Sequence, residues 1–112
     1  MRAKPTAIGY LRTDVSGISQ TWDEIQIRSL AKRYGYNLAK TVTFSAHTDD
    51  PLSRLLNVVQ RMDVDAVITP DLEYLGGAVP DDLVRVCEIN TISPQATYAP
   101  HAPFRFVDVD GT

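Results

Sequence analysis

Three carboxylates have the spacing that could support chemistry in this chain. Asp14 follows the first apolar segment, and Asp71 and Glu73 follow the third. If both segments are parallel strands, these side chains meet at the carboxyl edge of one sheet, where α/β proteins bind ligands. Three carboxylates there could hold Mg²⁺ and support phosphoryl transfer, with Asp71 as the acceptor. We favour the alternative, in which polar loops contain acids without binding a metal.

Arg12 lies at the end of the same first apolar segment. One interpretation makes its guanidinium group a ligand for phosphate. We favour the other, in which Arg12 forms an ion pair with Asp14, Asp71 or Glu73, because a charge at the end of a buried strand is usually paired.

Other metal-binding or nucleophilic side chains are scarce. The single cysteine, Cys87, excludes an intramolecular disulfide and a cysteine-based zinc cage. His47 and His101 lie far apart and lack the spacing of a zinc site. Cys87 lies among apolar residues, so we expect a small buried side chain rather than a nucleophile. We predict neither a bound metal nor a cofactor.

The composition is that of an ordinary globular domain. The chain has 112 residues, of which 44% are apolar and 22% charged, and its net charge is −3. These values exclude a disordered chain, and no apolar run approaches the roughly 20 residues of a membrane span. We expect a cytoplasmic protein without membrane contact. The acidic balance counts against a protein that grips nucleic-acid phosphates, which usually needs a basic excess.

Short apolar segments alternate with segments of helical period along the chain. We predict strands over residues 6–11, 37–44, 65–69 and 94–99, a loop over 14–19, and helices over 21–35, 51–62 and 80–87. Helices between short apolar strands favour right-handed crossovers and a mainly parallel sheet. The predicted fold is a three-layer α/β domain over residues 1–99, with a four- to five-stranded sheet and helices on both faces.

Residues 100–112 are predicted to form a C-terminal extension. Pro100 and Pro103 bound an extended spacer, and the following FRFVDV segment alternates in the manner of an edge strand. Phe104 and Phe106 then share one face. Because an edge strand with unpaired backbone groups invites pairing with another chain, we predict an interface at these two residues.

The order of motifs resembles the catalytic domain of the serine recombinases, the resolvase and invertase family. There, a strand reading GY-x-R-V-S leads through a loop to a helix with Q-I-x-x-L, matched here by Gly9, Tyr10, Arg12, Gln26, Ile27 and Leu30. The segment DDPLSRLLNVV is similar to the family's R-P-x-L-x-x-L-L helix, and DLEYLGG is similar to its L-D-R-L-G-R loop. The resemblance spans residues 6–99 and implies the same α/β fold.

The groups that perform the family's reaction are mostly replaced. In that family a serine attacks a DNA phosphodiester, and arginines stabilise the charge that develops on the phosphate oxygens. The position of the serine holds Asp14 here. Arg12 is kept, and the other positions hold Asp49 for an arginine, Glu73 for the acid, Tyr74 for an arginine and Gly77 for an arginine.

These replacements predict a site without catalytic residues. A phosphate would meet Asp14, Asp49 and Glu73, and each like-charge contact at about 4 Å costs about 4 kcal/mol at an effective dielectric constant of about 20. Ser16 could act as a displaced nucleophile, which is the weaker interpretation without the arginines. We therefore expect a protein that is not an enzyme.

Three functions stay open at this point. We predict a catalytically inactive, resolvase-like binding or scaffolding protein that associates with itself or with a protein partner, because the family's long dimer helix has no counterpart after Ala99 and apolar surface needs another cover. The second function is an accessory DNA-associated protein, with weak phosphate contacts from Arg12, Arg28 and Arg54. The third is Mg²⁺-dependent phosphoryl chemistry at the acidic corner.

Overall fold

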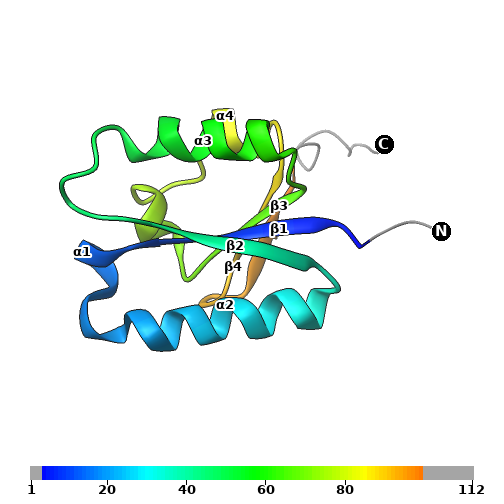
Figure 1. The fold of residues 1–112 in the computed structure, drawn as a ribbon, viewed down its shortest axis with the longest axis horizontal. Coiled ribbons are helices and arrows are strands. Elements are labelled where there is room, and N and C mark those ends of the chain that lie inside the picture. Colours follow the sequence, from blue (N-terminus) through cyan, green and yellow to red (C-terminus); the bar gives the residue numbers. More distant parts are fainter. Residues whose placement is uncertain (1–3, 100–112) are drawn as a thin grey trace, which may run out of the picture.

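Five strands form one sheet in the order β2-β1-β3-β4-β5 (Figure 1). The computed structural model describes residues 4–99. The strands are β1 (Thr6–Arg12), β2 (Asn37–Phe44), β3 (Ala66–Thr69), β4 (Glu88–Thr91) and β5 (Ala96–Tyr98). The pairs formed by β1, β2, β3 and β4 are parallel, and β5 runs antiparallel to β4.

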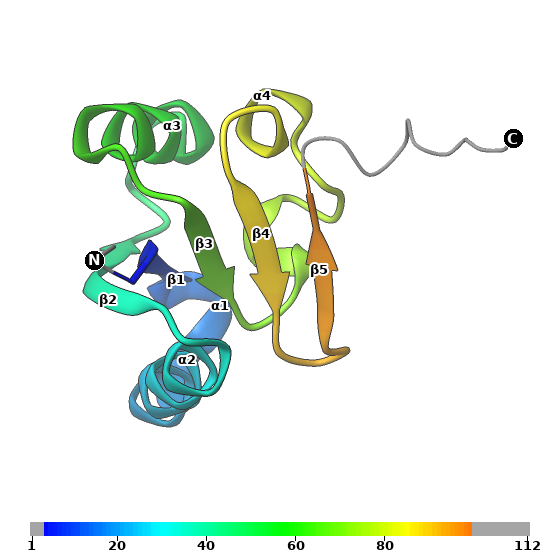
Figure 2. The same cartoon turned by 90° about the vertical axis from the view of Figure 1, so that its right-hand side faces the viewer.

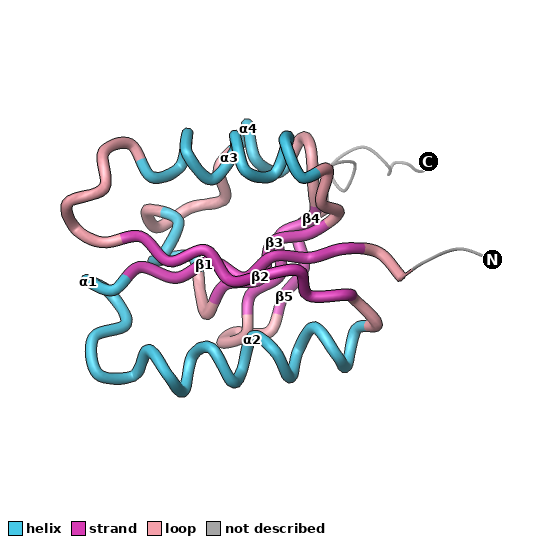
Figure 3. Tube along the Cα trace, in the orientation of Figure 1, coloured by secondary structure: helices cyan, strands magenta, loops and turns pink. Residues whose placement is uncertain are grey.

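Helices cover both faces of this sheet. On one face lies α2 (Gln20–Tyr34), and on the other lie α3 (Pro51–Met62) and α4 (Asp81–Val84) (Figure 2). The short helices α1 (Thr13–Ser16), η1 (Gly17–Ser19) and η2 (Leu72–Leu75) follow β1 and β3. Figure 3 shows the strands between the two helical layers, which confirms the predicted three-layer, mainly parallel α/β fold. Within residues 4–99, no helix is long and apolar enough to cross a membrane.

The core forms around the internal strands β1 and β3. All residues from 7 to 11 in β1 and all four residues of β3 are buried. Such continuous apolar segments are typical of strands that are covered on both faces. From one helical layer α2 contributes Ile27 and Leu30, and from the other α3 contributes Leu55 and Val59.

Gly9 sets the distance between α2 and the sheet. A Cβ atom at this position would lie 2.8 Å from Ile27 Cγ2 of α2 and 2.8 Å from Thr41 Oγ1 of β2. Because protein interiors are close-packed, a larger residue here must displace one of these neighbours.

The loop predicted over residues 14–19 is wrong, since α1 and η1 make this segment helical. Gly17, with φ of 56°, joins the two short helices. The hydroxyl of Ser19 donates to the backbone oxygen of Ser16 over 2.7 Å. A contact between side chain and backbone therefore helps to stabilise this segment, whose one buried residue is the polar Ser16.

The helix predicted over residues 80–87 ends early, at Val84, and it is followed by a strand, β4, that the hydrophobic pattern did not predict. Three of the four residues in β4 are polar, which obscures the hydrophobic pattern expected of a buried strand. The hydroxyl of Tyr36 donates to Glu88 over 2.7 Å and accepts from Asn90 over 3.5 Å. Thr91 Oγ1 donates to the backbone oxygen of Pro94 over 2.7 Å, so all three polar side chains have partners. The strand predicted over residues 94–99 is β5.

The C-terminal interface predicted at Phe104 and Phe106 lies outside the described residues, and it stays a prediction.

We expect Gly9→Ala to lower the free energy of unfolding by about 1–3 kcal/mol, the usual cost of overpacking. Alanine also lowers the conformational entropy of the unfolded chain, which stabilises the folded state by only about 0.4–1 kcal/mol. The clash with Ile27 and Thr41 therefore dominates. Urea denaturation measures the change. Asn57→Ala on the exposed side of α3 is the control and should stay within about 0.5 kcal/mol of the parent chain. An unchanged or increased stability of Gly9→Ala would contradict the close approach.

Candidate functional site

The candidate site lies at the carboxyl edge of the sheet, where β1 continues into α1 and β3 into η2 (Figure 1). Arg12 is the last residue of β1 and stands beside Phe44, the last residue of β2. The parallel strands bring together segments that are more than 50 residues apart in the sequence.

Arg12 and Asp14 form a two-point ion pair at this edge. Arg12 Nη2 lies 2.7 Å from Asp14 Oδ2, and Arg12 Nε lies 3.2 Å from Asp14 Oδ1. This confirms the predicted ion pair and selects Asp14 among the three acids considered. Paired hydrogen bonds between guanidinium and carboxylate groups are among the stronger polar contacts, so a phosphate would have to displace the Asp14 carboxylate.

Asp23 is the acceptor at the centre of a buried hydrogen-bonded cluster. Ser16 Oγ donates to Asp23 Oδ2 over 2.8 Å, and the Tyr74 hydroxyl donates to the same oxygen over 2.9 Å. The Ser16 and Tyr74 hydroxyls are themselves 2.8 Å apart. Ser19 adds a longer contact of 3.3 Å to Asp23 Oδ2. We call Ser16, Asp23 and Tyr74 the Asp23 cluster.

The Asp23 cluster is closed to solvent. Ser16, Asp23 and Tyr74 are 6%, 7% and 5% exposed. Burial raises the pKa of the Tyr74 hydroxyl; the bond with Ser16 opposes this shift, and the bond to the Asp23 carboxylate adds to it. Tyr74 therefore stays a neutral donor at a position where the resemblance implies a cationic arginine. Ser16, the displaced nucleophile considered above, is held by its two partners.

Tyr10 lies behind the ion pair in the core. Its ring meets Phe44 edge-on, with centroids 5.8 Å apart and an interplanar angle of 77°. Within residues 4–99 its buried hydroxyl has no hydrogen-bond partner. Burial raises the pKa of this hydroxyl, Arg12 lowers it, and Asp14 raises it again.

The remaining family positions do not join these groups. Asp49 contributes its backbone oxygen, which accepts from Arg54 Nε over 2.8 Å. The backbone nitrogen of Glu73 donates to Asp71 Oδ1 over 2.8 Å, which caps η2. Gly77 is an exposed turn residue with φ of 93°. Gln26 lies elsewhere, in a groove between α2 and the connection from β4 to β5.

The three arginines predicted as phosphate contacts do not form one site. Arg28 belongs to α2 and Arg54 to α3, which lie on opposite faces of the sheet (Figure 2). Arg54 instead shares a groove of about 250 Å³ on the α3 side with Asn57 and Arg61. Arg12 is occupied by its own acid. A single phosphate cannot bridge the two helical layers.

The acidic corner predicted from Asp14, Asp71 and Glu73 is not assembled as a metal site. In the described part of the chain, no group of three His, Cys, Asp or Glu residues is placed to hold a metal ion. The physical reason is that Asp14 turns to Arg12, whereas Asp71 caps η2.

Asp23 is the site residue that sequence reasoning missed. Ser16, Ser19 and Asp23 have spacings of three and four residues, which place them on one side of a helical segment. This spacing is present in the sequence, but the wrong prediction of a loop over residues 14–19 removed the helix that would have given it meaning.

Comparison with protein-family models and with curated proteins finds no match for the chain. Fold and site define an α/β domain whose carboxyl edge is filled by its own polar side chains, and the resemblance to serine recombinases stays a prediction.

We expect Asp23→Ala to lower the free energy of unfolding by about 2–4 kcal/mol. Two buried hydroxyls lose their common acceptor, and each unsatisfied polar group costs about 1–3 kcal/mol. Thr21→Ala, at an exposed position of the same helix, is the control and should change stability by at most about 0.5 kcal/mol. Thermal and urea denaturation provide the measurement. A loss below about 1 kcal/mol for Asp23→Ala would show that the cluster contributes little.

Cys87 is a buried thiol, as predicted, and is 3% exposed. Its Sγ atom donates to the backbone oxygen of Leu83 over 3.6 Å. Burial raises the pKa of the thiol to about 12, with smaller contributions from Glu88 and Asp65. The thiol is therefore protonated and inaccessible at neutral pH.

We expect the Cys87 thiol of the folded chain to react with a disulfide reagent at least about 100-fold more slowly than that of the urea-unfolded chain, since reaction requires local opening. The thiol of the unfolded chain loses its proton at lower pH than the thiol of the folded chain, whose pKa is about 12. Ionisation of Cys87 in the unfolded chain therefore lowers the free energy of unfolding as pH rises from about 9 to about 12. Cys87→Ala should remove that contribution from the pH dependence. Equal reaction rates in the folded and unfolded chains would contradict burial of the thiol.

Proposed function

We propose that this chain is a catalytically inactive, resolvase-like binding or scaffolding domain that associates with itself. The observation that carries the proposal is the closed carboxyl edge, at which Arg12 is neutralised by Asp14 and Ser16 is held in the Asp23 cluster. A phosphodiester would need a free nucleophile and unpaired cations at that edge. Arg12 and Ser16 can serve in neither role without breaking contacts within the chain.

Exposed apolar side chains support a binding role. Of the six large apolar residues exposed within residues 4–99, four lie in one stretch: Val15, Ile18, Trp22 and Ile25. Ile18 is 106% exposed and Trp22 is 59% exposed. Contiguous apolar surface of this kind marks interaction sites in proteins. The single cysteine fits a reducing, cytoplasmic environment, which we include in the proposal.

A second candidate is an accessory DNA-associated protein. The groove with Arg54, Asn57 and Arg61 favours it, because two guanidinium groups on one helix can contact a phosphate backbone. The net charge of −3 counts against it. Binding of mixed duplex DNA, followed by fluorescence anisotropy, should be no tighter than about 10⁻⁴–10⁻⁶ M at physiological salt.

We expect neither cleavage of supercoiled plasmid nor a covalent protein–DNA adduct. The absence of cleavage follows from the occupied carboxyl edge. An adduct at Ser16 would overturn the inactive assignment.

We also expect the mass measured by sedimentation equilibrium to rise with protein concentration. This rise follows from the exposed residues of α2. A chain that stays monomeric at high micromolar concentration would overturn self-association.

A further inference from the structure

The exposed side of α2 has an apolar half and a basic half. Trp22 and Ile25, three residues apart, are exposed on one side of α2, and Ile18 is exposed in η1 just before this helix. Farther along the same helix, Arg28 and Lys32 are exposed. We call these five residues the α2 ridge.

The cations of the α2 ridge are available for a partner. The two ion pairs found in residues 4–99 join Arg12 to Asp14 and Arg85 to Asp82. Arg28 and Lys32 take part in neither pair. Exposed apolar side chains beside two such cations match a surface that is apolar and bordered by carboxylates.

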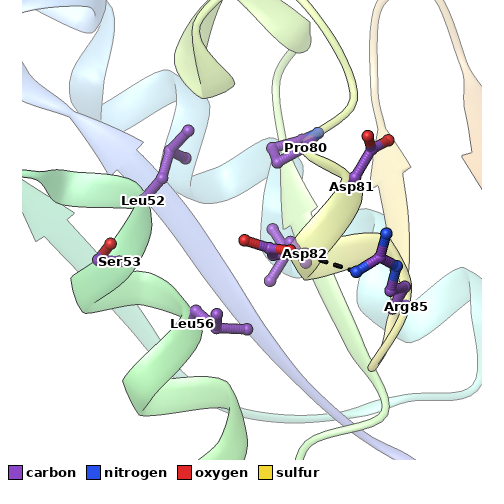
Figure 4. A pocket seen from close by; sticks show the side chains of 8 residues that line it. Leu52, Ser53, Leu56, Pro80, Asp81, Asp82 and Arg85 are labelled. Carbon is purple, nitrogen blue, oxygen red and sulfur yellow. Dashed lines mark ion pairs between the residues drawn. The ribbon is translucent and has the colours of Figure 1, made fainter.

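The opposite face of the molecule carries a surface of that chemistry. A groove of about 320 Å³ runs between α3 and α4 (Figure 4). Its apolar lining comes from Leu52 and Leu56 of α3 and from Pro80 and Leu83 at α4. Because a water molecule takes about 30 Å³ in the liquid, the groove has room for a large side chain.

Carboxylates border this groove. Asp81 and Asp82, both exposed, lie in the first turn of α4, with Arg85 beside them (Figure 4). Asp82 pairs with Arg85 over 3.5 Å, and their side chains are 78% and 73% exposed. Ion pairs this exposed contribute little, so an incoming cation can replace Arg85.

We infer that the α2 ridge of one copy docks into the α3–α4 groove of a second copy. In this arrangement, which rests on the proposed self-association, Trp22 and its apolar neighbours enter the groove while Arg28 and Lys32 meet Asp81 and Asp82. Pairing two α2 ridges would instead bring two sets of the same cations to one interface.

Head-to-tail growth follows from the positions of the two surfaces. The ridge and the groove lie on opposite faces of the sheet (Figure 2). A contact between two different surfaces leaves one ridge and one groove open in every dimer, so more copies add to form a ring or a filament. The partner recognised by this domain is thus another copy of itself.

The test uses two charge-reversed chains. The groove variant carries Asp81→Lys and Asp82→Lys, and the ridge variant carries Arg28→Glu and Lys32→Glu. Each alone should associate about tenfold or more weakly than the parent chain, because like charges then face each other across the contact. Mixing the two variants should restore assembly, because each basic surface again meets an acidic one. Sedimentation velocity measures mass, and the fluorescence of the single tryptophan reports burial of the ridge.

A matched control separates this contact from general charge effects. Asp49→Lys with Glu73→Lys makes the same change of charge at two exposed positions of the carboxyl edge, and it should assemble like the parent chain. Circular dichroism and urea denaturation confirm that each variant is folded.

The outcomes distinguish the inference from the proposed function. A monomeric parent chain overturns both. A parent chain that associates while the groove variant associates equally well overturns the head-to-tail contact and leaves self-association standing. Loss of assembly in each variant, with recovery on mixing, supports the contact between ridge and groove.

Discussion

The carboxylate of Asp23 holds the carboxyl edge of this domain together. A buried carboxylate is costly unless hydrogen-bond donors surround it, and here the donors come from α1, η1 and η2. One acid in α2 therefore ties the segment that follows β1 to the segment that follows β3. Removing any one donor leaves a charged group less satisfied in the interior, so the three segments depend on each other.

This constraint changes where binding can occur. Open α/β sheets normally accept ligands at the carboxyl ends of their strands. In this domain, Tyr74 and Ser16 fill part of that edge, and the pairing of Arg12 with Asp14 neutralises the nearby cation. Exposed apolar and charged side chains lie on the two helical layers instead. This is why we propose a binding function at the helix faces.

The hydrophobic pattern predicted most of the elements that build the core. β1, β2, β3, α2 and α3 each have an apolar run or stripe, and each was predicted within a few residues. An ion pair of Arg12 with Asp14, Asp71 or Glu73 was also predicted, and the structure selects Asp14, two residues further along the chain. The pattern failed for α1, η1 and β4, and it extended the helix at α4 beyond its end at Val84. Polar contacts such as that between Tyr36 and Glu88 support β4.

The amino-acid sequence by itself determined the fold class, since it follows from residue types and their local spacing. Only the tertiary structure decided that Tyr74 donates to Asp23, because the two residues are 51 positions apart and meet only when β1 and β3 pair. Within residues 4–99, it likewise decided that Asp14, Asp71 and Glu73 form no group able to hold a metal ion. The direction of a carboxylate depends on which donor is nearest in space, and that information lies in the packing of the strands and helices.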